Sequence, residues 1–214
     1  MPSGADICDS CRGKLTFVKE PYCLKCGKPL GTETELCELC KTKRMYFDEG
    51  RALYIYNDVL RKSIYGFKYN NRREYSGFYG AQMAKGLKRK LTEWRADAII
   101  PIPLHKSRMK KRGYNQAALL AHEISKYTKI PVYDEYLIRQ KSTVPQKNLD
   151  VHARENNLKN AFKIKYNDVQ LNSVILIDDI YTTGSTINEA AKCLKDAGVK
   201  NVYYAVISCA YSGN

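Results

Sequence analysis

The sequence lacks long apolar segments. No run of apolar residues approaches the ~18 that suggest a membrane-spanning helix. The first ten residues, MPSGADICDS, show no basic region followed by an apolar stretch. We therefore expect no membrane insertion, no secretory signal peptide and a cytoplasmic location. Disulfide bonds are rare in that compartment, so the eight cysteines indicate metal binding, nucleophilic chemistry or core packing instead.

Acidic residues are scarce as well. The chain has 214 residues, with 36 Lys and Arg against 22 Asp and Glu, which gives a net charge of +14. The excess is uneven, because residues 1–50 hold eight basic and eight acidic side chains, whereas residues 61–112 hold 15 basic and 3 acidic ones. Aromatic residues are interleaved with the charge in this second stretch. A solvated surface is one explanation, but we favour a face that binds a polyanion such as nucleic acid.

Six of the eight cysteines form three Cys-x-x-Cys pairs in the first 40 residues. In chain order, the three pairs are Cys8/Cys11, Cys23/Cys26 and Cys37/Cys40. Two such pairs supply the four thiolates of a tetrahedral zinc site. Gly27 follows the second pair, where the turn of a zinc knuckle tolerates a left-handed backbone. We therefore predict that the second and third pairs bind one structural zinc ion, which leaves the first pair without partners. The alternative zinc site uses the first and second pairs.

The rest of the chain predicts an α/β fold. A ribbon of about 45 residues has too small a core to fold without metal, so we predict a zinc ribbon over residues 1–48 and a larger domain over residues 49–214. Strand-like and helix-like segments alternate in the larger domain, which favours a mostly parallel sheet flanked by helices. The strands are expected at Arg51–Tyr56, Ala98–Pro103, Val174–Ile177 and Val202–Ser208, and the helices at Asp58–Tyr69, Gly77–Leu91, Asn115–Tyr127 and Ser185–Ala197.

The segment VILIDDIYTTGST, residues 174–186, carries the clearest chemical signal. A buried strand leads to two carboxylates, Asp178 and Asp179, and ligands bind at the carboxyl ends of strands in such sheets. The loop that follows leads into a helix, where free N–H groups and hydroxyls form a phosphate cradle. The cradle residues are Thr182, Thr183, Gly184, Ser185 and Thr186. The segment thus predicts a phosphorylated sugar, with the carboxylates on ribose hydroxyls or magnesium. An ordinary strand–turn–helix with capping Thr and Ser is the alternative.

Two further segments favour a phosphoribosyl site. The run Ala98–Pro103 is followed by cations, which suits a loop that stabilises departing pyrophosphate, although alone this stretch equally suits a nucleic-acid patch. We expect His105, Lys106 and Arg108 in the pyrophosphate loop. The segment Arg139–Phe162 is charged and poor in apolar residues. It predicts a flexible hood over an active site, or a plain surface loop.

Taken together, these segments resemble the ComF family of competence-associated proteins, which have an N-terminal zinc finger and a type I phosphoribosyltransferase domain. The matching stretches are the Cys-x-x-Cys pairs, FKYNNRREY, PIPLHKSRMKKRGYNQA, residues 139–162 and VILIDDIYTTGST, in family order over nearly the whole chain. The resemblance implies that phosphoribosyl pyrophosphate (PRPP) and magnesium meet Asp178 and Asp179 as catalytic residues, with the 5′-phosphate on residues 182–186. Family members often carry four Cys-x-x-Cys pairs, and this chain has three.

The resemblance also implies a role in natural transformation, in handling single-stranded DNA beside a competence helicase of the ComFA type. We expect DNA to bind where aromatics and cations alternate, with about half of those aromatics in the core. The predicted DNA-binding cations are Lys68, Arg72, Arg73, Lys110, Lys111 and Arg112. An active phosphoribosyltransferase with an unknown acceptor is the alternative, although no general base stands out. A third hypothesis is that PRPP biases DNA binding.

Overall fold

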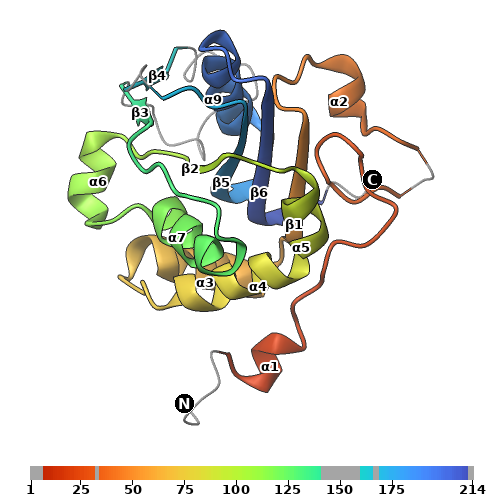
Figure 1. Cartoon of the computed structure of the whole chain (residues 1–214). Helices are drawn as coiled ribbons and strands as arrows, with labels where there is room; N and C mark the ends of the chain where they lie inside the picture. The colour runs from red at the N-terminus through yellow and green to blue at the C-terminus, as the bar shows by residue number, and fades with distance from the viewer. Residues whose placement is uncertain (1–6, 32–33, 141–159, 166–168, 212–214) are drawn as a thin grey trace.

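A parallel sheet forms the centre of the molecule. The computed structural model describes residues 7–31, 34–140, 160–165 and 169–211. In this part of the chain, four strands pair in the order β1-β6-β5-β2, and all three pairings are parallel (Figure 1). The strands are β1 (Glu49–Ile55), β2 (Ala98–Pro101), β5 (Ser173–Tyr181) and β6 (Asn201–Cys209). The predicted fold class, with its mostly parallel sheet, is confirmed.

Helices cover both faces of this sheet (Figure 1). Side chains alternate along β5, so that Val174 and Leu176 enter one core cluster while Ile175 and Ile177 enter the other. The run is apolar throughout because both faces are buried. One face packs on α3 (Asp58–Tyr69), α4 (Tyr75–Gly86), α5 (Lys88–Glu93) and α7 (Gln116–Thr128), and the other on α9 (Ser185–Asp196). No helix in the described ranges has both the length and the apolar character that crossing a membrane requires.

The part of the N-terminal ribbon that holds the second and third cysteine pairs packs on the same sheet face as α9, whereas Leu15 packs on the opposite core cluster. The ribbon includes the short helices α1 (Asp9–Arg12) and α2 (Glu38–Thr42). Cys23 and Cys26 are fully buried in one cluster with Phe47 and Tyr204, and the Tyr204 hydroxyl donates a hydrogen bond of 2.6 Å to the Cys26 carbonyl. Gly27 has φ +67°, and a Cβ there would lie 2.5 Å from the Gly50 carbonyl oxygen. The left-handed turn expected after the second cysteine pair is therefore confirmed.

Some elements differ from their predicted bounds. β5 runs past Ile177 to Tyr181, so both aspartates lie inside the strand and not after it. The predicted helix Gly77–Leu91 is instead two helices, α4 and α5, with Leu87 between them. The cationic segment after β2 contains the helix α6 (Lys106–Arg112), which His105 caps by accepting a hydrogen bond of 3.2 Å from the Ser107 amide.

A small two-stranded sheet borders the predicted hood. β3 (Leu137–Arg139) and β4 (Phe162–Ile164) pair antiparallel, and the Gln140 amide bonds to the Ala161 carbonyl at 2.9 Å. Between these strands, residues 141–159 of the hood lie outside the described residues. The two described ends of this segment therefore lie side by side in one two-stranded sheet.

Candidate functional site

The two aspartates of β5 line a cavity of about 880 Å³. The residues around it come from the carboxyl ends of β2 and β5, from α3 and α6, and from the loop before α9. This is the edge of a parallel sheet at which ligands bind in α/β proteins. The strand order and the cavity thus place Asp178 and Asp179 where the sequence predicted a site.

Asp179 is held by two side chains from the helices on one sheet face. It is only 4% exposed. Its Oδ1 accepts a hydrogen bond of 2.7 Å from Lys68 Nζ, and its Oδ2 accepts one of 2.8 Å from Gln116 Nε2. Lys68 was predicted as a DNA-binding cation; the structure places it inside the cavity, in an ion pair. Gln116 was not predicted, because nothing in its sequence context indicates a polar residue at a buried helix start.

Asp178 lies in a different electrostatic setting. Burial and the neighbouring charge of Asp179 raise its pKa to about 7, against the opposing effect of Lys68 and Arg139. Its Oδ1 accepts a hydrogen bond of 2.9 Å from the Asp179 amide. A carboxyl with this pKa exchanges its proton near neutral pH, so a bound cation that favours the ionised form would displace that proton.

All five residues of the predicted phosphate cradle line the cavity. Gly184 has φ +75°, and a Cβ there would lie 2.3 Å from the Tyr181 hydroxyl oxygen. This turn directs the chain into α9, which begins at Ser185. The Thr183 and Ser185 hydroxyls lie 2.9 Å apart. A twelve-residue helix thus begins at the cavity wall with hydroxyls around its positive end, which suits an anion.

The charged side chains of the remaining wall are all cations. Five cations line the cavity, namely Lys68, Arg108, Lys111, Arg112 and Arg139. Burial lowers the pKa of Arg139 to about 10, so it keeps its charge at neutral pH. Arg139 was not predicted as a site residue, although it begins the hood segment that the sequence singled out. Three predicted DNA-binding cations therefore share one cavity with the phosphate cradle.

The other predicted cations lie outside this cavity. His105 caps α6 and Lys106 is its first residue; like Lys110, neither lines the wall. Arg72 pairs with Glu74 at 3.4 Å. Arg73 lies 4.7 Å over the ring of Tyr114. Their roles in binding pyrophosphate or DNA stay predictions.

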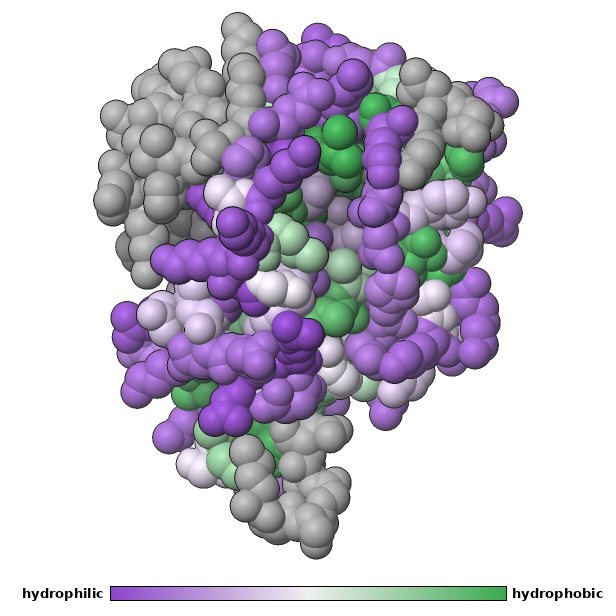
Figure 2. Space-filling view, turned by 90° about the vertical axis from the view of Figure 1, so that its left-hand side faces the viewer, coloured by the Kyte–Doolittle hydropathy of each residue, from purple (hydrophilic) through white to green (hydrophobic). Residues whose placement is uncertain are grey.

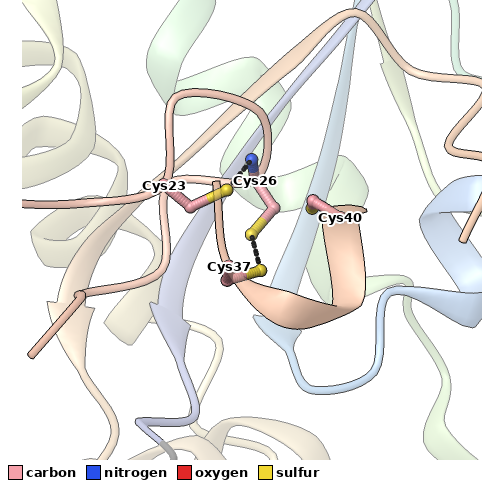
Figure 3. A group of neighbouring side chains, drawn as sticks. All are labelled: Cys23, Cys26, Cys37 and Cys40. Carbon is pink, nitrogen blue, oxygen red and sulfur yellow. Dashed lines mark hydrogen bonds between the residues drawn. The ribbon is translucent and has the colours of Figure 1, made fainter. Parts of the chain in front are cut away.

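The second and third cysteine pairs form one compact cluster (Figure 3). All four Sγ atoms lie within 4.8 Å of one another, and those of Cys26 and Cys37 are 3.7 Å apart. Zinc–sulfur bonds of about 2.3 Å in a tetrahedron place sulfurs about 3.8 Å apart, so the cluster fits zinc. The structure thus brings the predicted ligands Cys23, Cys26, Cys37 and Cys40 together in one cluster, as a structural zinc site requires.

The first pair takes no part in this cluster. Cys8 is exposed and Cys11 is partly buried, and both lie at α1, well away from α2 (Figure 1). The alternative site, built from the first and second pairs, is therefore not the one that the fold assembles.

Comparison with known proteins agrees with this organisation. Residues 1–41 match the family described as Double zinc ribbon domain, and residues 81–211 match the Phosphoribosyl transferase domain. A purine phosphoribosyltransferase from Pyrococcus horikoshii Ot3 overlaps 60% of this chain and 71% of its own, at 16% identity and a TM-score of 0.36, which is too distant to bear on function.

Relatives cover nearly the whole chain. It is 33% identical to competence protein F of Haemophilus influenzae, over 91% of this chain and 93% of that protein. It is 30% identical to competence protein ComFC of Bacillus subtilis, over 90% and 79%. It is 29% identical to the DNA utilization protein YhgH of Escherichia coli strain K12, over 92% and 87%. With a zinc ribbon followed by a phosphoribosyl transferase domain, this chain belongs to the competence protein F (ComF) family.

Proposed function

We propose that this protein acts in natural transformation, where it handles single-stranded DNA beside a competence helicase, and that its cavity binds PRPP with magnesium. The names of its relatives, competence proteins and DNA utilization proteins, support the competence role. The observation that supports PRPP as the ligand is the composition of the cavity, in which a carboxylate, a helix N-terminus and five cations face one space. A sugar with a phosphate at one end and a pyrophosphate at the other fits that arrangement.

Each part of the cavity suits one part of PRPP. The loop of residues 182–186 would take the 5′-phosphate at the start of α9. Arg108 and Lys111 would face the pyrophosphate. Asp178 would meet the ribose hydroxyls and, together with phosphate oxygens, supply the oxygen ligands that Mg²⁺ prefers. The ion would neutralise charge on the pyrophosphate.

We assign Asp179 a supporting part instead of a ligand-binding one. Both of its oxygens already accept hydrogen bonds, from Lys68 and Gln116. The sequence suggested equal roles for the two aspartates, because it showed only their adjacency. The geometry favours Asp178 as the carboxylate that meets the ligand and Asp179 as the group that positions Lys68 in the wall.

Calorimetric titration of Mg²⁺·PRPP into the protein tests the cavity. We expect binding to the unaltered protein and none to Asp178→Asn, which keeps the shape of the side chain but not its charge. Asp196→Asn is the matched control, because Asp196 is an exposed residue that pairs with Lys192 at 2.5 Å. Absence of binding at millimolar PRPP would contradict the proposal for the cavity.

Salt dependence tests the DNA part separately. Neutralising phosphates releases counterions, so affinity for a single-stranded oligonucleotide should fall steeply as salt rises. Because the chain carries a net charge of +14, we expect a large slope. Affinity that does not change with salt would argue against an electrostatic DNA interface.

Phosphoribosyl transfer is the second candidate function. It is favoured by the partly buried Arg108 and by Lys111, which line the cavity and would stabilise departing pyrophosphate. In that reaction the bond from ribose C1 to pyrophosphate breaks and a bond from C1 to an acceptor forms. Pyrophosphate release from PRPP measures it. Release that is unchanged in Asp178→Asn would argue against transfer at this site.

A further inference from the structure

Two exposed tyrosines stand together on α3. Tyr65 is 52% exposed and Tyr69 is 59% exposed. They lie one helical turn apart, and their ring centroids are 4.8 Å apart. The core face of the same helix is filled by Leu60, Ile64 and Phe67, all essentially fully buried. The two tyrosines therefore do not hold α3 in place, and their exposure needs a separate explanation.

This pair differs from the other exposed aromatics. Among the described residues, it is the only ring pair in which both rings are exposed. Phe17 packs on the buried Tyr54 at 4.8 Å, while Tyr127 and Tyr211 are exposed without a neighbouring ring in the described structure. Two adjacent exposed rings offer an aromatic surface that is larger than one side chain and is already assembled.

Cations frame the pair on the side of the cavity. The Arg112 guanidinium lies 5.1 Å over the ring of Tyr69, and both residues line the cavity. Lys111, from the same end of α6, lines it as well. Residues 58–75 contain two carboxylates, Asp58 and Glu74, and these pair with Arg61 and Arg72. Figure 2 shows that hydrophilic side chains cover most of the face near α6.

We propose that Tyr65 and Tyr69 form a stacking platform for successive bases of single-stranded DNA, with Arg112 and Lys111 on the phosphates. The proposal rests on the proposed handling of single-stranded DNA and says where on the molecule the strand binds. Bases of any sequence stack on aromatic rings, whereas cations follow the backbone. Because Tyr69 and Arg112 also line the cavity, the strand passes the cavity mouth.

Loss of the rings should weaken binding without changing its salt dependence. The test compares Tyr65→Leu/Tyr69→Leu with the unaltered protein by fluorescence anisotropy of a labelled oligothymidylate. Leucine preserves helix propensity and apolar character but offers no aromatic face. Each lost stack should cost at least about fivefold in affinity, while the slope against salt stays the same. Tyr127→Leu, a change at an equally exposed but isolated tyrosine, should bind as tightly as the unaltered protein.

An oligonucleotide that lacks bases separates stacking from charge. The same chain length with abasic sugars should bind the unaltered protein and the double variant equally, because only the phosphate contacts remain. If the unaltered protein binds oligothymidylate and the double variant binds it equally well, the platform is wrong while DNA handling stands. If the unaltered protein binds no oligonucleotide, the proposed function itself fails. A change from dimer to monomer in the double variant, with DNA affinity unchanged, would assign the rings to self-association and overturn the proposal.

Discussion

At the scale of single residues, Asp178 should make stability depend on pH. Its pKa of about 7 in the folded protein exceeds the value of about 3.9 in an unfolded chain. Between these values the folded state holds a proton that the unfolded state has lost, so the free energy of unfolding falls as pH rises from about 4 to about 7. Asp178→Asn removes this loss and should stabilise the protein by about 2–4 kcal/mol above pH 7.

Urea unfolding at several pH values measures this effect. The gain from Asp178→Asn should be small near pH 4, grow through the neutral range and level off above about pH 7. The groups that face Asp178 are Asp179, Lys68 and Arg139, and all remain in the variant. A gain of the same size at every pH would show that the substitution acts through packing and not through the proton.

The ion pair of Lys68 with Asp179 should be costly to break from one side. The side chains are 22% and 5% exposed, so Lys68→Met leaves a nearly buried carboxylate without its cation. We expect a loss of about 3 kcal/mol in the free energy of unfolding, at the lower end of the range for buried pairs because Lys68 is partly exposed. Lys68→Met/Asp179→Asn should recover much of it, because Asn keeps an oxygen for Gln116. Equal stability of Lys68→Met and the unaltered protein would contradict this.

The sequence could predict residues that act within one segment. Asp178, Asp179 and residues 182–186 stand together in the chain, and a strand followed by a helix start suffices to aim them at one site. The sequence could not show that Lys68 and Gln116 both bond to Asp179, because they lie 111 and 63 positions away from it in the chain. Partners at such separations depend on how helices cross the sheet.

At the scale of elements, the second and third cysteine pairs of the ribbon should bind metal, whereas the first pair should not. Cys37→Ser removes a ligand from the cluster and should lower both zinc content and the melting temperature, because metal binding contributes directly to the folding of small zinc domains. Cys8→Ser is the matched control, since Cys8 is exposed on α1 and outside the cluster. We expect its zinc content to be unchanged, as measured by elemental analysis. Loss of zinc in Cys8→Ser alone would overturn the ligand assignment.

The sequence predicted best the elements whose apolar residues recur at a regular helical spacing. α3 spans the predicted residues 58–69, because the spacing of Leu60, Ile64 and Phe67 marks one buried face. β3 and β4 were not predicted, because a strand of three residues is too short to show an alternation of apolar and polar side chains. α6 was expected as part of a loop. None of its residues is buried, so its sequence shows no apolar face; the helix is instead capped by the His105 side chain at its start and by the left-handed Gly113 at its end.

At the scale of the whole molecule, the two proposed ligands should oppose one another. Arg112 lines the cavity and lies over Tyr69, and it also bonds to Gln116, which bonds to Asp179. Lys111 lines the same cavity, so a pyrophosphate in the cavity and a DNA phosphate at its mouth would compete for Lys111 and Arg112. Saturating Mg²⁺·PRPP should therefore weaken single-stranded DNA binding by about fivefold or more, within the usual range of coupling between sites.

Linkage supplies the control for this coupling. DNA must weaken PRPP binding by the same factor as PRPP weakens DNA binding, and both can be measured by titration. Lys111→Leu/Arg112→Leu should reduce the factor towards one, because both shared cations are gone. Equal DNA affinity with and without PRPP would refute the coupling while leaving each binding site intact.

The charge of the chain predicted a cationic face but not which of its cations line the cavity. The excess in residues 61–112 supplies Lys68, Arg108, Lys111 and Arg112 to one cavity. Arg72 and Arg73 do not line it, and they bond to Glu74 and Asn71. Composition gives the sign of a surface, and only the folded arrangement of α3 and α6 around the cavity decides which charges converge.

The contact between Tyr204 and Cys26 can form only after both residues have been synthesised. These residues are 178 positions apart, and a chain grows at about 5–20 residues per second. Roughly 9–36 s thus separate their translation. The ribbon is therefore made well before β6, the strand against which it packs. During that interval the packing partner of the ribbon is missing, so we expect a metal bound to the four cysteines to be what keeps the ribbon folded.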